Sequence, residues 1–292
     1  MFAATLPSEV PEDIIRIGPP VAFQRGDGAA TLRVRRRGQG TVLADLYQRS
    51  PCRVLFPDRA ADEPLEAVLV TTSGGLAGGD RLEIDIAAAA GSHALVTTQA
   101  AEKVYRSLGA DSQVSVRLEV AGDAVLEWLP QETILFEGAR LDRRTVAEIA
   151  PGGRLLAAEM VVFGRLARGE SFSRGLWHEA WRIKRDGRLL WADAMHLEED
   201  IARTIASDSG LAAAEALACV LYVGKDAEPL TAVVRGIQDA APGRAGATRL
   251  GDVLIARWLG TASLVREQLL SFLAEFRGAA GLAGRLPRVW YS

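Results

Sequence analysis

The sequence predicts a mainly β protein with an elongated, stacked or solenoid-like body and a few helices in the C-terminal third. Three observations favour this class. Segments of alternating or β-branched residues recur along most of the chain, glycine-containing turn signals separate them, and some of these glycines recur about 30 residues apart. The chain has 292 residues, of which 49% are hydrophobic and 24% charged, so it can bury a substantial core.

Strand character comes from β-branched residues and from alternation of polar and apolar side chains, which places one face of a strand against a core. The expected strands are residues 31–37, 41–47, 67–72, 81–86, 93–98, 112–120, 124–129, 143–149, 155–163, 177–184 and 189–194. Turn signals between them lie at residues 38–40, 91–92, 122–123, 151–153 and 186–187.

A weak internal repeat organises these strands. Residues 84–98, 115–129 and 145–160 each show a strand, a turn and a strand, and the turns contain Gly91, Gly122 and Gly152. A fourth, looser unit turns at Gly187. One such unit cannot bury its apolar face alone, so neighbouring units must stack. We therefore expect either two facing sheets or a solenoid-like stack.

The C-terminal third has a different pattern. Residues 227–239 and 263–276 are expected to be helices, and in the second an apolar stripe follows one face, which indicates packing on the sheet or docking of a partner. Residues 252–258 are expected to be a return strand, and residues 209–223 either a helix or a buried segment of strand and helix. We expect a single domain over residues 1–292, with an N-terminal extension (1–25), a β body (26–200) and a mixed C-terminal part (201–292).

Composition argues against several classes of function. The net charge of −3 offers little attraction to nucleic acid or to an anionic membrane surface, and no apolar run reaches membrane-spanning length. Two cysteines are too few for a disulfide scaffold or a cysteine-ligated zinc site, and the N-terminus has no basic cluster typical of a secretory signal. We expect a cytoplasmic protein that binds neither nucleic acid nor membrane.

The glycine-rich segment at residues 71–80 (TTSGGLAGGD) is not a nucleotide-binding loop. A phosphate loop closes with Lys and Ser or Thr, whereas this run closes with Asp80, whose charge would repel phosphate. A dinucleotide fingerprint also needs a helix at the glycines, but residues 81–86 alternate as a strand. The glycines therefore connect two strands.

Carboxylates in apolar surroundings are the main candidates for a functional site. Glu127, Glu132 and Glu159 lie in apolar segments, where an acid must reach solvent, find a partner or line a wet cavity. If they point inward together with Asp80 and Thr98, they would line an oxygen-rich channel. Oxygen ligands let divalent cations pass, whereas imidazole and thiolate clusters hold nickel tightly. The three histidines lie far apart in the sequence, without a paired spacing, so no tightly bound cofactor is expected.

Three motifs, in order and at characteristic spacing, carry a resemblance to a known family. They are residues 71–80 (TTSGGLAGGD), 97–107 (TTQAAEKVYRS) and 126–136 (LEWLPQETILF). On these motifs the chain resembles the UreD (UreH) family of urease accessory proteins. The resemblance is dense over residues 36–197, weaker after Ser209, and returns at residues 286–290.

The resemblance implies a non-enzymatic scaffold that binds apo-urease. Its implied partners are the urease structural subunits, an all-helical bridging accessory protein and a nickel-carrying GTPase, and nickel would pass in transit through an internal tunnel. The implied tunnel residues are the metal candidates Asp80, Glu127, Glu132 and Glu159, with Ser73, Thr98 and Lys103 as further motif residues.

Two other functions remain open at this stage. One is a carbohydrate-active enzyme on a β-solenoid, in which two of Glu127, Glu132 and Glu159 act as acid and base about 5–10 Å apart in an open, aromatic cleft. The other is a β-rich binding module without a metal role. An open aromatic groove would favour the enzyme, and a closed, oxygen-lined tunnel would favour the scaffold.

Overall fold

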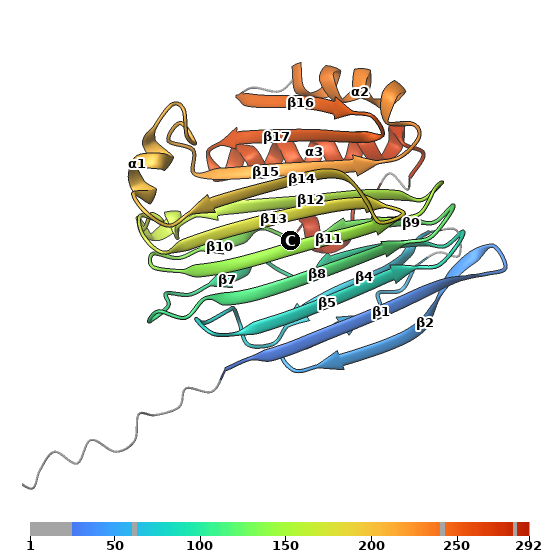
Figure 1. Ribbon diagram of the computed structural model, residues 1–292, viewed down its shortest axis with the longest axis horizontal. Coiled ribbons are helices and arrows are strands. Elements are labelled where there is room, and N and C mark those ends of the chain that lie inside the picture. The colour runs from blue at the N-terminus through green and yellow to red at the C-terminus, as the bar shows by residue number, and fades with distance from the viewer. Residues whose placement is uncertain (1–24, 60–62, 240–242, 283–284, 292) are drawn as a thin grey trace, which may run out of the picture.

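The computed structural model describes residues 25–59, 63–239, 243–282 and 285–291 (Figure 1). The expected N-terminal extension, apart from Arg25, lies outside these residues. Two sheets of seven and ten strands stack against each other, and in Figure 1 their strands follow one another from β1 and β2 at the bottom to β16 at the top. The predicted fold class, a mainly β stacked body with few helices, is confirmed.

The first sheet has the order β14-β13-β11-β8-β5-β1-β2. Its strands are β1 (Asp27–Arg37), β2 (Gly40–Arg49), β5 (Arg81–Ala88), β8 (Ser112–Val120), β11 (Arg140–Ile149), β13 (Leu176–Arg185) and β14 (Arg188–Leu197). The second sheet has the order β16-β17-β15-β12-β9-β6-β4-β3, with β7 and β10 paired beside β12. Its strands are β3 (Cys52–Leu55), β4 (Leu65–Thr71), β6 (His93–Thr98), β7 (Glu102–Val104), β9 (Val125–Leu129), β10 (Thr133–Leu135), β12 (Arg154–Phe163), β15 (Ala216–Val223), β16 (Arg244–Leu250) and β17 (Val253–Gly260).

The chain alternates between the sheets as it coils. Strands β5, β8 and β11 pair in parallel in the first sheet, and β6, β9 and β12 pair in parallel in the second. Ile84 pairs with Val116 and Val116 with Thr145, so equivalent positions recur at the predicted spacing. At the shared corner, the N–H of Gly91 donates to the carbonyl of Gly122 (3.3 Å). The internal repeat is therefore a solenoid-like coil.

Two apolar cores follow from this arrangement. The first lies between the sheets, where the alternating burial of β8 points Val114, Val116 and Leu118 inward. The second lies between the other face of the ten-stranded sheet and the C-terminal helices. Strand β15 is buried at every position because both its faces are covered.

The helices are α1 (Ile201–Ala206), α2 (Ala227–Asp239) and α3 (Ala262–Ala279), with short 3₁₀ turns η1 (Leu166–Arg168) and η2 (Arg288–Tyr291). The predictions at residues 227–239 and 263–276 are confirmed, and the return strand is β17. The apolar stripe of α3 packs on the sheet, with Phe272 against Trp258 at a ring-centroid distance of 4.8 Å. No helix among the described residues is long and apolar enough to cross a membrane.

Some elements differ from the sequence-based expectation. For residues 209–223 the buried strand is confirmed as β15, and the prediction of a helix in this segment is wrong because its first half forms turns. Strands β7 and β10 were not expected, since three residues are too few to show alternation. Edge strand β16 was also not expected, because it is mostly exposed and has no apolar face that would mark it.

A corner glycine provides a test of the coil. Gly152 has φ +86, and a Cβ there would lie 2.7 Å from Asp123 Oδ1, so we expect Gly152→Ala to lower the free energy of unfolding by about 1–3 kcal/mol. Gly278→Ala is the matched control, because a Cβ there meets nothing within 4 Å and Gly278 lies in α3. Urea denaturation of both variants measures the difference. Equal free energies of unfolding for Gly152→Ala and Gly278→Ala would contradict the prediction that a side chain at Gly152 strains this turn.

Candidate functional site

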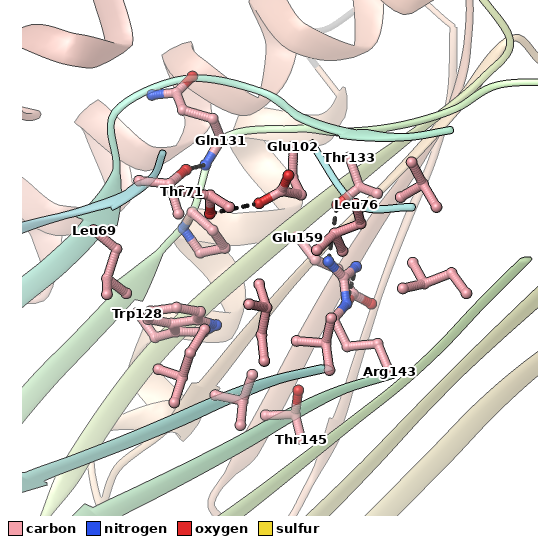
Figure 2. Close-up of a pocket in the computed structure, with 18 of the residues that line it drawn as sticks. Leu69, Thr71, Leu76, Glu102, Trp128, Gln131, Thr133, Arg143, Thr145 and Glu159 are labelled. Carbon is pink, nitrogen blue, oxygen red and sulfur yellow. Dashed lines mark hydrogen bonds and ion pairs between the residues drawn. The ribbon is translucent and has the colours of Figure 1, made fainter. Parts of the chain in front are cut away.

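An interior cavity of about 60 Å³ lies between the two sheets, and polar side chains converge on it (Figure 2). Thr71 comes from the end of β4, Glu102 from β7, Thr133 from β10, Arg143 from β11 and Glu159 from β12. Apolar side chains from both sheets, among them Leu69, Leu76 and Trp128, form the rest of the wall. The cavity is thus a polar interruption of the first core.

Strand alternation brings these polar groups inside. On β11, Leu141, Arg143 and Thr145 share the inward face with apolar neighbours of the first core. On β12 the inward positions are Ala157, Glu159 and Val161, since Leu156, Ala158 and Met160 belong to the second core. An ordinary strand pattern therefore places a charge in the interior wherever a charged residue occupies an inward position.

Arg143 is the centre of an interior charge network. Its Nε donates to both carboxylate oxygens of Glu179 (2.9 and 2.6 Å), and its Nη1 donates to the Thr133 hydroxyl (2.8 Å). Glu159 lies 3.8 Å from Arg143 Nη2 and accepts a hydrogen bond from Trp181 Nε1 (2.9 Å). One guanidinium thus faces two carboxyl groups.

Glu102 lies beside this network. The Thr71 hydroxyl donates to its carboxylate (2.8 Å). Burial raises the pKa of Glu102 to about 6, and the negative charge of Asp80 adds to the rise, while the Thr71 hydrogen bond and Arg143 oppose it. Burial, with the nearby charge of Glu179, also raises the pKa of Glu159 well above its usual range. Both groups can therefore hold a proton that a metal cation could replace.

Two further hollows lie near the cavity, and only the first of them shares lining residues with it. A loop pocket of about 150 Å³, formed between the 71–75 and 98–103 segments, shares Thr71, Thr98 and Glu102 with the interior cavity. A surface groove of about 630 Å³ shares Lys103 with the loop pocket. Lys103 is exposed to solvent. Glu102 therefore stands where the interior cavity meets the loop pocket.

The structure distributes the sequence-predicted residues over several places. Thr98 and Glu159 line the interior cavity. Lys103 and Glu132 line the surface groove, where Glu132 accepts a hydrogen bond from Arg266 Nη1 (2.5 Å). The metal candidates Glu132 and Glu159 thus line different hollows, and the structure does not bring them together.

The other three predicted residues lie elsewhere. Asp80 is buried in the glycine-rich turn and accepts the N–H groups of Gly26 (2.7 Å) and Ala77 (2.8 Å). The Ser73 hydroxyl donates to the Gly75 carbonyl (3.0 Å) within the same turn. Glu127 is in the second core, on the side of the sheet away from the interior cavity, paired with helix α3.

Sequence reasoning missed Glu102, Arg143 and Glu179. For Glu179 the sequence did hold a signal, because the residue alternates with two tryptophans on one strand face. Trp177, Glu179 and Trp181 are all buried in the structure. Glu102 lies inside the quoted motif at residues 97–107, but it occupies a three-residue strand without alternation. Arg143 is the first residue of the expected strand 143–149, where no local pattern marks an interior charge.

The geometry does not assemble the other site types considered from the sequence. Glu127, Glu132 and Glu159 occupy the second core, the surface groove and the interior cavity, so they form no carboxylate pair in one open cleft. In the part of the chain that the structure describes, no three or more His, Cys, Asp or Glu side chains gather so that they could hold a metal ion. Burial raises the pKa of the Cys52 thiol to about 11, which disfavours a thiolate ligand.

Comparison with known proteins matches residues 26–291 to a family described as UreD urease accessory protein. The urease accessory protein UreD of Magnetococcus marinus is 43% identical over 263 residues, covering 88% of this chain and 91% of that protein. UreD 1 of Methylobacterium radiotolerans is 42% identical over 298 residues, covering 100% of both chains. UreD 2 of Methylorubrum populi is 41% identical over 281 residues, covering 94% of this chain and 93% of that protein.

Proposed function

Because this chain belongs to the UreD family of urease accessory proteins and so serves urease maturation, we propose that it is a non-enzymatic scaffold that binds apo-urease and conducts nickel through its interior. The partners that we propose are the urease structural subunits, a helical bridging accessory protein and a nickel-carrying GTPase. The motif resemblance at residues 71–80, 97–107 and 126–136 supports these partners.

The observation that carries the nickel path is the row of oxygen ligands between the loop pocket and the interior. Thr98, Thr71 and Glu102 lie where the two hollows meet, and Glu159 lies deeper in the cavity. Hydroxyl and carboxyl oxygens bind nickel more weakly than imidazole or thiolate ligands, so an ion can move between them. The geometry therefore favours transit over storage.

The interior charges suit a cation that enters and leaves. With the raised pKa values of Glu102 and Glu159, an arriving Ni²⁺ would displace protons instead of entering a fully ionised cluster. Arg143, held by Glu179, keeps a positive charge beside Glu159 and limits how tightly this end of the path can bind a cation. The acids thus attract nickel without trapping it.

The test is the double variant Glu102→Gln with Glu159→Gln, expressed with urease and its accessory proteins. We expect a severalfold fall in urease nickel content and activity, because both amides keep the shape but lose the ionisable oxygen ligands. Pull-down should recover the same subunits as the unaltered chain. Glu119→Gln, an exposed position on β8, is the matched control and should load urease normally.

Each result points to a different part of the proposal. Full nickel loading of urease by the double variant, with the complex intact, would refute the interior path. Failure of the unaltered chain to recover urease subunits would refute the scaffold role itself.

A further inference from the structure

Two of the three histidines of the chain, far apart in sequence, meet on the outer face of the first sheet. His178 on β13 and His196 on β14 are direct partners in the antiparallel register, and their Nδ1 atoms lie 3.4 Å apart. Their side chains are 26% and 56% exposed. Because Trp177 and Glu179 point inward, His178 points away from the interior cavity. This histidine pair is thus separate from the proposed path.

Each ring has a carboxylate at its other nitrogen. His178 Nε2 lies 4.0 Å from Asp142 Oδ1, and His196 Nε2 lies 3.6 Å from Glu198 Oε2. A negative charge near Nε2 favours the tautomer with its proton there, and in that tautomer the Nδ1 lone pair can bind a metal. Metal-binding histidines commonly donate this N–H to a carboxylate, and here the two carboxylates lie just beyond hydrogen-bond distance.

Arginines hold both carboxylates in place. Arg144 Nη2 donates to Asp142 (2.8 Å), and Arg140 Nη2 donates to Glu198 (2.8 Å). The two carboxylates are therefore fixed on the Nε2 side of the rings, away from the Nδ1 atoms. A metal ion here would have the two imidazoles as its protein ligands, because no three or more His, Cys, Asp or Glu side chains gather to hold a metal among the described residues.

The separation of the two Nδ1 atoms matches the requirement of one metal ion. Metal–imidazole bonds of about 2.0–2.1 Å place two ligand nitrogens ~2.9 Å apart at a right angle and ~3.4 Å apart at a tetrahedral angle. The observed distance is 3.4 Å. The contact has the geometry of a hydrogen bond in which one Nδ1–H donates to the other Nδ1, and a cation bound by both nitrogens would take the place of that proton.

We propose that His178 and His196 form a surface site for a divalent transition-metal ion that prefers imidazole ligands, with water completing its coordination. Ni²⁺, Cu²⁺ and Zn²⁺ have this preference. The identification of the natural ion as nickel rests on the proposed function, whereas the site itself does not. Partial exposure of both rings allows the ion to exchange with solvent.

The experiment is a titration of the full-length chain, without a polyhistidine tag, with Ni²⁺ followed by calorimetry. We expect one site, and His178→Ala and His196→Ala should each weaken it by more than about tenfold. Asp142→Asn with Glu198→Gln should weaken it by about tenfold while keeping both ligands. Leu189→Ala, an exposed position on β14, is the control and should leave binding unchanged.

NMR of ¹⁵N-histidine-labelled chain provides an independent readout. Paramagnetic Ni²⁺ at substoichiometric amounts should broaden the ring signals of His178 and His196 but not of His93, whose Nε2 lies 2.8 Å from Glu127 Oε1. Equal Ni²⁺ affinity of the unaltered chain and the His178→Ala/His196→Ala double variant would overturn the proposal, as would uniform broadening of all three rings. Neither measurement involves urease, so failure here is distinguishable from failure of the interior path.

Discussion

Replacement of Arg277 with alanine is expected to lower the free energy of unfolding by about 3–5 kcal/mol, the largest stability effect that we predict for this chain. Arg277 on α3 and Glu127 on β9 are both 0% exposed, and Arg277 Nε donates to Glu127 Oε2 (2.6 Å). Arg277 also donates to the carbonyl of Arg285. Removal of the guanidinium would leave Glu127 as a buried carboxylate whose remaining partner among the described residues is the partly exposed His93.

The effect should depend on pH. Burial alone would raise the pKa of Glu127, but the hydrogen bonds from His93 and Arg277 outweigh it and lower the pKa below its usual value. A lowered pKa in the folded state stabilises the protein above the ordinary carboxyl range, and this contribution is lost as pH falls through the folded-state value. The difference between the unaltered chain and Arg277→Ala should therefore narrow in acid.

Chemical denaturation at pH 7.5 measures the difference, and a double-mutant cycle isolates the pair. Glu127→Leu together with Arg277→Met replaces both charges with apolar groups and should recover most of the loss, because no charge remains unpaired. A loss below about 1 kcal/mol for Arg277→Ala would show that the pair does not attach α3 to the sheet.

Glu102→Gln is expected to stabilise the protein by about 2 kcal/mol above pH 6. The carboxyl has an ordinary pKa of 4.5 and a folded-state pKa of about 6, so the folded state prefers the protonated form. Stability is then complete below pH ~4.5 and decreases as pH rises through about 6, where burial of the ionised group is unfavourable. Glutamine retains an acceptor for the Thr71 hydroxyl and cannot ionise.

Chemical denaturation of Glu102→Gln and of the unaltered chain at pH 4.5 and pH 8 shows whether the substitution raises or lowers the free energy of unfolding. The stabilisation should be present at pH 8 and absent at pH 4.5, and the exposed variant Glu119→Gln should change stability by less than about 0.5 kcal/mol at both. Destabilisation by Glu102→Gln at pH 8 would mean that the carboxylate is ionised and well paired. If Glu102→Gln stabilises the protein and also impairs nickel delivery to urease, then Glu102 lowers the stability of the folded protein but is required for function.

The sequence determined the elements whose signal is local. Backbone periodicity shows in the alternation of β8 and in the apolar stripe of α3. The turns with Gly91, Gly122 and Gly152 recur at a regular spacing along the chain. The order of the strands along the chain and the repeat of the coil could therefore be predicted. The family motifs were equally readable, because they are contiguous strings of residues. Short strands such as β7 contain too few residues for any period.

Only the tertiary structure decided what each inward or outward polar residue contacts. Glu127 and Glu159 both lie in apolar strands of the same sheet, yet one faces α3 and Arg277, 150 residues away, and the other faces the interior cavity. His178 and His196 meet because the register of β13 and β14, with its irregularity between Ile183 and Lys184, places them opposite each other. Such contacts depend on strand register and on helix docking. Strand register and helix docking both arise from the packing of segments that are distant in sequence, and a local sequence pattern cannot predict this packing.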